Sequence, residues 1–302
     1  MKLNRLFFVL LILTTACAAP LSPTASPLPT QPEVAPVAPA DSSPEPDPAN
    51  GTTLYVSATM HIETKFDSWP ADTETFLAFL QQTTDAGIRW SIGGDIGWLE
   101  GDPRAQEIVT RSAAMGVEWD VHAHKVEDLA KTASILSAWG VTPTGVVNGM
   151  LIADFDALRQ PLTYQGYTWT PEVIWGGVQC PGHREGCDDL SVSIYHPVSS
   201  AQFYVDDPNG NLIKIGGGAH TLEGAESLAA AIASGQYNYP VICYTIMVEP
   251  ETLRIAKSAT DDVDVILAFA ARMDAYPFVR WETIATTAQA WVRAGSVAFQ
   301  IP

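Results

Sequence analysis

The sequence predicts an α/β domain with the architecture of a (β/α) barrel, preceded by a disordered N-terminal tether. Residues 18–50 are rich in proline and lack Lys and Arg, so they bury too little apolar surface to fold. Residues 52–302 have the length of about 250 residues that is typical of one α/β barrel. Within them, short apolar runs alternate with segments of helical periodicity, which indicates parallel strands joined by crossover helices.

Residues 1–16 have the features of an export signal. A positively charged start precedes the apolar run Leu6–Leu13, which is far shorter than the ~20 residues that span a bilayer. The Thr-Ala-Cys sequence that ends at Cys17 is typical of a bacterial lipoprotein cleavage site, and an ordinary secretory signal with later cleavage is the alternative. We therefore expect an exported protein that faces outside the cytoplasm, anchored to the membrane by a lipid on Cys17, with residues 17–51 as its stalk.

The charge of the chain restricts its partners. The sequence has 16 Lys and Arg against 34 Asp and Glu, which gives a net charge of −18. Such a charge opposes binding to nucleic acid or to an anionic membrane surface. We expect no nucleic-acid partner, and membrane contact only through the lipid.

The first strand is predicted at residues 54–60 and the first helix at 72–87. Asp72 is a typical helix N-cap and Gly87 a typical stop. Between them, four side chains recur on one helical face: Phe76, Phe79, Leu80 and Thr83. A second strand is predicted at 88–94.

The alternation continues through the middle of the chain. The next elements are a helix at 102–116 with Pro103 in its first turn, a strand at 117–123, a helix at 126–140 that ends at Gly140, and a strand at 144–151. After Asp156 the pattern loosens, and residues 167–177 and 211–218 indicate hairpin-like insertions. It returns with a helix at 222–234, a strand at 240–248 and two closing helices around 261–273 and 281–292.

The cysteines predict one disulfide. Cys180 and Cys187 flank a short loop in a protein that has left the cytoplasm, so we expect them to be joined. A metal knuckle that includes His183 is the alternative, although the spacing of the two thiols is unusual for zinc. Cys243 lies in an apolar run and is predicted to be a buried free thiol.

Polar side chains gather at the ends of three successive strands. His61 and Glu63 follow the first strand, Asp95 the second, and His122 and His124 the third. The carboxyl ends of parallel strands line the site of such folds, and residues two apart point to the same side. Two protonated imidazoles side by side repel, whereas a divalent metal binds two neutral ones. We therefore predict a metal site with His61, Glu63, His122 and His124 as ligands, most consistent with zinc. The alternatives are a core histidine and, for Asp95, a helix cap.

Aromatic residues and one glycine-rich segment are further candidates. Three of the nine tryptophans, Trp69, Trp98 and Trp175, are predicted on loops where they could stack on a sugar. Residues 216–220 could bring backbone N–H groups and His220 to an anion, or form a flexible loop.

Residues 116–146 resemble the second signature of the polysaccharide deacetylases. The matching positions are Gly116, Glu118, Trp119, His122, Leu129, Gly140 and Pro143. Residues 55–64 stand where that family has its Thr-Phe-Asp-Asp-Gly strand end, and residues 275–288 resemble its closing strand and helix. The resemblance implies a distorted seven-stranded barrel and a metal-dependent hydrolase that removes acetyl groups from a carbohydrate.

Several positions depart from that family. Its paired carboxylates after the first strand are replaced by His61 and Ile62. Its two metal histidines are usually four residues apart, whereas His122 and His124 are two apart and position 126 is Val. The Arg-containing block after the fourth strand is missing. These departures affect the expected activity more than the expected fold.

The departures leave three functions open. In a deacetylase, the metal would activate water toward an acyl carbonyl, with Asp95 or Glu249 as general base or acid. The first alternative is a lipoprotein on the same fold that binds a carbohydrate or a metal without catalysis. The second is a glycoside hydrolase in which Glu63 acts with Asp95 or Glu249.

Overall fold

The structure is a computed structural model that describes residues 51–63, 72–180, 186–248 and 259–301. The predicted signal and the stalk up to residue 50 lie outside the described residues. So do three residues named above: Trp69, His183 and Glu249.

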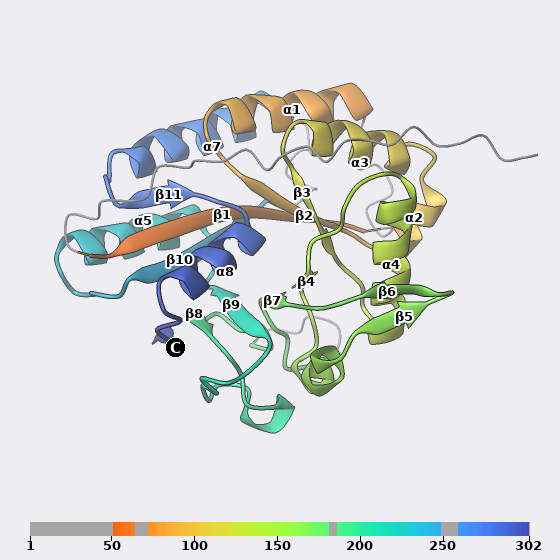
Figure 1. The fold of residues 1–302 in the computed structure, drawn as a ribbon. Helices are drawn as coiled ribbons and strands as arrows, with labels where there is room; N and C mark the ends of the chain where they lie inside the picture. The colour runs from red at the N-terminus through yellow and green to blue at the C-terminus, as the bar shows by residue number, and fades with distance from the viewer. Residues whose placement is uncertain (1–50, 64–71, 181–185, 249–258, 302) are drawn as a thin grey trace, which may run out of the picture. The chain divides into compact units, whose positions relative to one another are not determined.

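Seven parallel strands form most of one curved sheet (Figure 1). Their order is β10 (Val241–Met247), β1 (Thr53–Ile62), β2 (Trp90–Gly94), β3 (Glu118–Val121), β4 (Val146–Asn148), β7 (Val173–Trp175) and β9 (Ile213–Gly217). Beyond β9, the antiparallel β8 (Val192–Tyr195) pairs with β12 (Phe299–Ile301), and β11 (Val279–Trp281) pairs with β1.

The sheet closes almost completely on itself. Strand β10, at one end of the order, packs close to β8 and β9 near the other end. Across this seam the Cys243 thiol on β10 donates a hydrogen bond of 3.4 Å to the main-chain oxygen of Ser193 on β8. The predicted α/β barrel is therefore confirmed, with seven parallel strands in consecutive positions of a sheet that also contains β8, β11 and β12.

Helices cover the outside of the sheet. They are α1 (Thr73–Asp85), α2 (Ile96–Gly101), α3 (Ala105–Ala114), α4 (Val126–Ala138), α5 (Leu222–Ala233), α7 (Ala259–Asp274) and α8 (Ile284–Arg293). In Figure 1, α1 packs between α3 and α7, while the hairpin β5 (Leu162–Tyr164) and β6 (Tyr167–Trp169) lies against α4. Two 3₁₀ helices, η1 (Ile152–Arg159) and η2 (Ser200–Gln202), contact each other.

Buried tryptophans on two strands donate hydrogen bonds to hydroxyl groups on the helices that precede those strands. Trp90 on β2 donates its ring N–H to the Thr83 hydroxyl on α1, at 2.8 Å. Trp119 on β3 does the same to the Ser112 hydroxyl on α3, at 3.0 Å. Both rings are fully buried. Each therefore adds apolar area to the core without leaving a polar atom unsatisfied.

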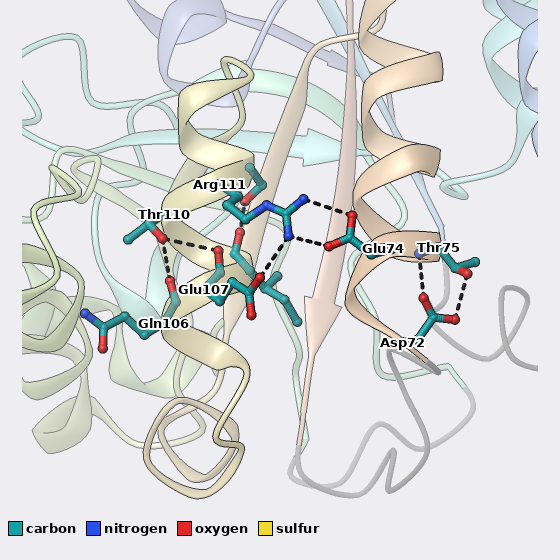
Figure 2. A network of polar contacts seen from close by, with 9 residues as sticks. Asp72, Glu74, Thr75, Gln106, Glu107, Thr110 and Arg111 are labelled. Atoms are coloured by element: carbon teal, nitrogen blue, oxygen red, sulfur yellow. Dashed lines mark hydrogen bonds and ion pairs between the residues drawn. The ribbon is translucent and has the colours of Figure 1, made fainter.

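Polar contacts at the surface fix the start of α1 and its contact with α3 (Figure 2). The Asp72 carboxylate accepts the backbone N–H of Thr75 at 2.7 Å, which confirms the predicted N-cap. Arg111 on α3 donates two hydrogen bonds to Glu74 on α1, at 2.5 and 2.9 Å, and one to Glu107, at 2.8 Å. Because these groups are exposed, the network orients the helices more than it stabilises them.

Several elements differ from the sequence prediction. Helix α2 was not predicted, and it places Trp98 in a buried turn rather than on a loop. Strand β7 belongs to the main parallel sheet, and β9 pairs in parallel with β7 on one side while it pairs antiparallel with β8, the strand before it, on the other. Both are short and almost wholly buried, so they lack the alternation that identifies a strand. The antiparallel pair β5 and β6 overlaps the hairpin-like insertion predicted at 167–177.

The cysteines behave as predicted. Cys180 and Cys187 form a disulfide with a Cα–Cα distance of 5.6 Å. Cys243 is a free, buried thiol, and burial raises its pKa to about 12. Of the helices that the structure describes, none combines the length and the apolar character needed to cross a membrane.

Candidate metal centre

A cavity of about 690 Å³ opens at the carboxyl ends of the parallel strands. The strand ends that line it include His61 and Glu63 after β1, His122 and His124 after β3, Trp175 of β7, His220 beyond β9 and Met247 of β10. Helix α4, η1 and the segment around Asp188 and Asp189 supply the rest of the wall. Such a position is where α/β barrels bind their ligands.

His61 and Glu63 reach the cavity from the end of β1. They are two residues apart, so their side chains leave the strand on the same side. His61 is 8 % exposed and Glu63 is 6 % exposed. An acidic side chain buried to this degree is stabilised by a positive partner, such as a protonated imidazole or a cation.

His122 arrives from the end of β3 and stacks on His61. The ring centroids are 4.0 Å apart, and the ring planes differ by 24°. Nε2 of His122 lies 3.6 Å from Oε1 of Glu63, and this nitrogen is buried without a hydrogen-bond partner among the described residues. A buried nitrogen without a partner is costly unless a ligand satisfies it.

The three side chains fit a divalent cation. One donor atom from each of His61, Glu63 and His122 can be chosen so that all lie within 4.8 Å of one another. Two ligands of tetrahedral zinc, each at ~2.1 Å, lie ~3.4 Å apart. The 3.6 Å between His122 and Glu63 is close to that separation. Two imidazoles and a carboxylate are also a ligand set that zinc accepts in proteins.

Two glycines leave room for the histidines. A Cβ atom on Gly93 of β2 would lie 2.6 Å from Cβ of His122. A Cβ atom on Gly149 would lie 3.0 Å from Cε1 of His61, and Gly149 also has a left-handed backbone with φ +86°. Side chains at either position would push the imidazoles out of their present places.

Asn148, at the end of β4, contacts both histidines. Its side-chain Oδ1 lies 2.7 Å from Nε2 of His61, and its main-chain oxygen lies 2.6 Å from Nδ1 of His122. The sequence analysis did not identify this residue. The signal that could have identified Asn148 is the one that identified His61 and His122. It is a polar side chain at the carboxyl end of an otherwise apolar strand.

His124 lies beside this group rather than within it. Its Nε2 is 3.4 Å from Oε2 of Glu63, and its ring centroid is 5.2 Å from that of His122. Its side chain is 50 % exposed, against 5 % for that of His122. The role predicted for it as a metal ligand stays a prediction, because the compact group contains only the other three residues.

Asp95 occupies a different place from the one expected of a catalytic acid or base. Its carboxylate accepts the backbone N–H of Trp98 at 2.7 Å and caps α2. Among the described residues that line the cavity, Asp95 does not occur. The structure therefore shows the cap, which was the alternative interpretation, and the predicted catalytic role of Asp95 stays a prediction. The second predicted catalytic residue, Glu249, lies outside the described residues.

Aromatic side chains form one side of the cavity. The Trp175 ring contacts His61 edge-on at 5.8 Å and lies 5.0 Å from the ring of His220. Trp175 is a strand residue, not the loop residue predicted, and its buried ring N–H has no hydrogen-bond partner within the described part of the chain. His220 has a left-handed backbone with φ +58°, and burial lowers the pKa of its imidazole.

Two buried ionisable side chains, Asp120 and Lys214, contact residues at or beside the site. Burial raises the pKa of Asp120 on β3 well above its usual range, and the carboxylate accepts hydrogen bonds from Thr144 and Asn148. Lys214 on β9 is fully buried and forms an ion pair with Asp189, which lines the cavity. Burial lowers the pKa of this lysine. Neither group was identified from the sequence, because nothing in the local pattern separates them from ordinary strand residues.

No protein-family model matches the sequence, and no curated protein matches it either. The fold is similar to that of solved structures. A protein of Parabacteroides distasonis described as a glycoside hydrolase/deacetylase is 12 % identical, with a TM-score of 0.54 over 82 % of this chain and 73 % of that one. The similarity shows a shared fold.

Two further structures are less similar. A probable polysaccharide deacetylase from Pseudomonas aeruginosa PAO1 is 11 % identical, with a TM-score of 0.46 over 80 % of this chain and 91 % of that one. The Puue allantoinase is 10 % identical, with a TM-score of 0.49 over 83 % and 94 %.

Proposed function

We propose that this protein is a metal-dependent hydrolase that removes acetyl groups from a carbohydrate outside the cytoplasm. The observation that carries the proposal is the buried group of His61, Glu63 and His122 in a cavity at the carboxyl ends of a parallel barrel. The fold shared with a protein described as a glycoside hydrolase/deacetylase supports a hydrolase that acts on carbohydrate.

In this proposal His61, Glu63 and His122 hold a divalent cation, with zinc as the first candidate. When bound, the cation supplies Lewis-acid polarisation of an acyl carbonyl and a lowered pKa of water. The protein itself fixes the donors, because the histidines are stacked and both contact Asn148. Their burial also keeps bulk water from the donor atoms.

His124 is the group that we assign to proton transfer. It lies next to Glu63, and half of its side chain is exposed, so it can exchange protons with solvent. An imidazole at this place can accept a proton from water or donate one to the leaving hydroxyl or amine. Glu63 would orient it, because Oε2 of Glu63 faces His124 while Oε1 faces His122.

The cavity has the size and the aromatic wall of a site for a small saccharide unit. Its volume of about 690 Å³ lies within the ~300–1,000 Å³ of typical ligand pockets. Trp175 lines this cavity, and its buried ring N–H has no hydrogen-bond partner among the described residues. A sugar ring beside Trp175 would place an acyl group near His61, because the centroids of the two side-chain rings lie 5.8 Å apart.

Acetate release tests the proposal. Purified protein loaded with Zn²⁺ is incubated with acetylated chitooligosaccharides and with acetylated peptidoglycan fragments. We expect acetate from at least one of them, no acetate with His122→Ala, and metal retention without turnover for His124→Gln. Asp95→Asn is the matched control, because Asn also caps helices. It should stay active, whereas loss of turnover would restore a catalytic role to Asp95.

Other outcomes would contradict the proposal. Release of reducing ends without acetate would indicate a glycoside hydrolase, and saturable sugar binding without turnover would indicate a binding protein. The membrane anchor is a separate part of the proposal. Cys17→Ser should move the protein from the membrane fraction to the soluble fraction, and an unchanged distribution would contradict lipidation at that residue.

A further inference from the structure

We propose that Asn148 is the positioning residue of this centre and holds the two histidines in opposite tautomers. In this arrangement Nδ1 of His61 and Nε2 of His122 carry the lone pairs that face the ligand. The inference rests on the proposed role of both histidines as metal ligands. Its structural part, the choice of tautomer, holds in the metal-free protein as well.

The main chain of Asn148 fixes His122. The carbonyl oxygen can only accept a hydrogen bond, and Nδ1 of His122 lies 2.6 Å from it. Nδ1 must therefore carry the proton and donate it. In the neutral ring this leaves the lone pair on Nε2, the buried nitrogen that lies 3.6 Å from Oε1 of Glu63. A ligating histidine commonly donates its other ring N–H to a carbonyl in this way.

The side chain of Asn148 has one defined orientation, which Thr59 sets. The Thr59 hydroxyl has one hydrogen, and its main-chain acceptor on Ser91, at 2.7 Å, is much closer than Oδ1 of Asn148, at 3.5 Å, so the hydroxyl donates to Ser91 and presents a lone pair to the amide of Asn148. Nδ2 of Asn148 donates to this lone pair at 3.0 Å and to Oδ2 of Asp120 at 2.9 Å. A flipped amide would place two oxygens against each other at Thr59, whatever the protonation of Asp120.

This orientation determines the tautomer of His61. With Nδ2 facing Thr59 and Asp120, it is Oδ1 that faces Nε2 of His61 at 2.7 Å. Because an amide oxygen only accepts, Nε2 of His61 carries the proton, and the lone pair of the neutral ring lies on Nδ1. The same residue thus protonates opposite nitrogens of two rings that are stacked 4.0 Å apart.

Nitrogen NMR of the metal-free protein tests the tautomers directly. Long-range ¹H–¹⁵N correlation spectra of the full chain, labelled at histidine, separate protonated from unprotonated ring nitrogens in each of the 6 histidines. Single His→Gln variants assign the signals. We expect His61 as the Nε2–H form and His122 as the Nδ1–H form under mildly alkaline conditions.

Variants of Asn148 then separate its two contacts. Asn148→Leu removes the amide but keeps the main-chain oxygen, so His61 should lose its fixed tautomer while His122 keeps Nδ1–H. Zn²⁺ affinity should fall by ~10–100-fold. Thr59→Val keeps the volume and removes one partner of the amide, and it should weaken Zn²⁺ binding less. Asn211→Leu is the matched control, because its amide donates to the main-chain oxygen of Arg159 at an exposed site away from the histidines.

Each outcome decides the inference. A proton on Nδ1 of His61 in the unmodified protein would overturn it, as would unchanged tautomers and unchanged Zn²⁺ affinity in Asn148→Leu. If Asn148→Leu does not fold, the same readouts on Thr59→Val decide. Predicted tautomers without acetate release would uphold the inference and contradict the proposed function, so the two failures are distinguishable.

Discussion

Replacing Gly93 with alanine should disturb the metal centre, because Gly93 lies on β2, next to the strand that carries His122. The new Cβ would lie 2.6 Å from Cβ of His122, against ~3.5–4.0 Å for an ordinary carbon contact. Strand β2 is paired with β1 and β3 on its two sides, so it cannot retreat. His122 must therefore shift by ~1 Å, which exceeds the ~0.5 Å that such sites tolerate.

The expected magnitudes follow from that shift. Overpacking should lower the free energy of unfolding by ~1–3 kcal/mol, and Zn²⁺ affinity should fall by ~10–100-fold. Urea unfolding of the metal-free protein and competition with a chromogenic chelator measure the two effects. Gly101→Ala is the control, because that exposed residue at the end of α2 has no atom within 4 Å of a new Cβ. Equal stability and equal Zn²⁺ affinity in the two variants would refute the argument.

Three further predictions concern buried groups. Lys214→Met should lower the free energy of unfolding, measured with urea, by ~3–5 kcal/mol, because it leaves the Asp189 carboxylate buried without its partner. Adding Asp189→Leu should recover most of that loss. No recovery would contradict the pairing of Lys214 with Asp189. Burial raises the pKa of Glu118 above its ordinary 4.5, so the native state binds this proton more tightly than the unfolded state. The contribution of Glu118 to the free energy of unfolding should therefore fall as the pH rises from 4.5 through the raised pKa. Over the same interval, the stability of Glu118→Gln relative to the unmodified protein should rise. A stability difference between the two proteins that does not change with pH would contradict this prediction. Iodoacetamide should leave Cys243 unmodified in the native protein, since the pKa of this buried thiol is about 12, while peptide mapping should recover Cys180 linked to Cys187.

The sequence was sufficient for the barrel because its strongest signals are local. Strand–helix alternation, the cap at Asp72 and the strand-end histidines each depend on a few neighbouring residues. These signals predicted the α/β barrel and most of its parallel strands, whereas the seven-stranded form was implied by the family resemblance. The short strands β7 and β9 were assigned to insertions, since a strand buried on both faces has no alternation to detect.

The site was harder to predict, because its members come from distant parts of the chain. The side chains of Asn148 and Asp120 are 28 positions apart in sequence, and only the register of β3 and β4 brings them into contact. Asp95 illustrates the opposite case. A strand-end carboxylate has the same sequence signature whether it binds a ligand or caps the next helix, and here it caps α2.

The central claim is that His61, Glu63 and His122 together bind one divalent cation. Elemental analysis of the purified full chain, dialysed with Zn²⁺ and then freed of unbound metal, tests it most directly when it is compared with a His61→Ala, His122→Ala double variant. We predict about one zinc per chain in the unmodified protein and none in the double variant, with both proteins equally folded by circular dichroism. Zinc absent from both proteins, or equal in both, would contradict the claim.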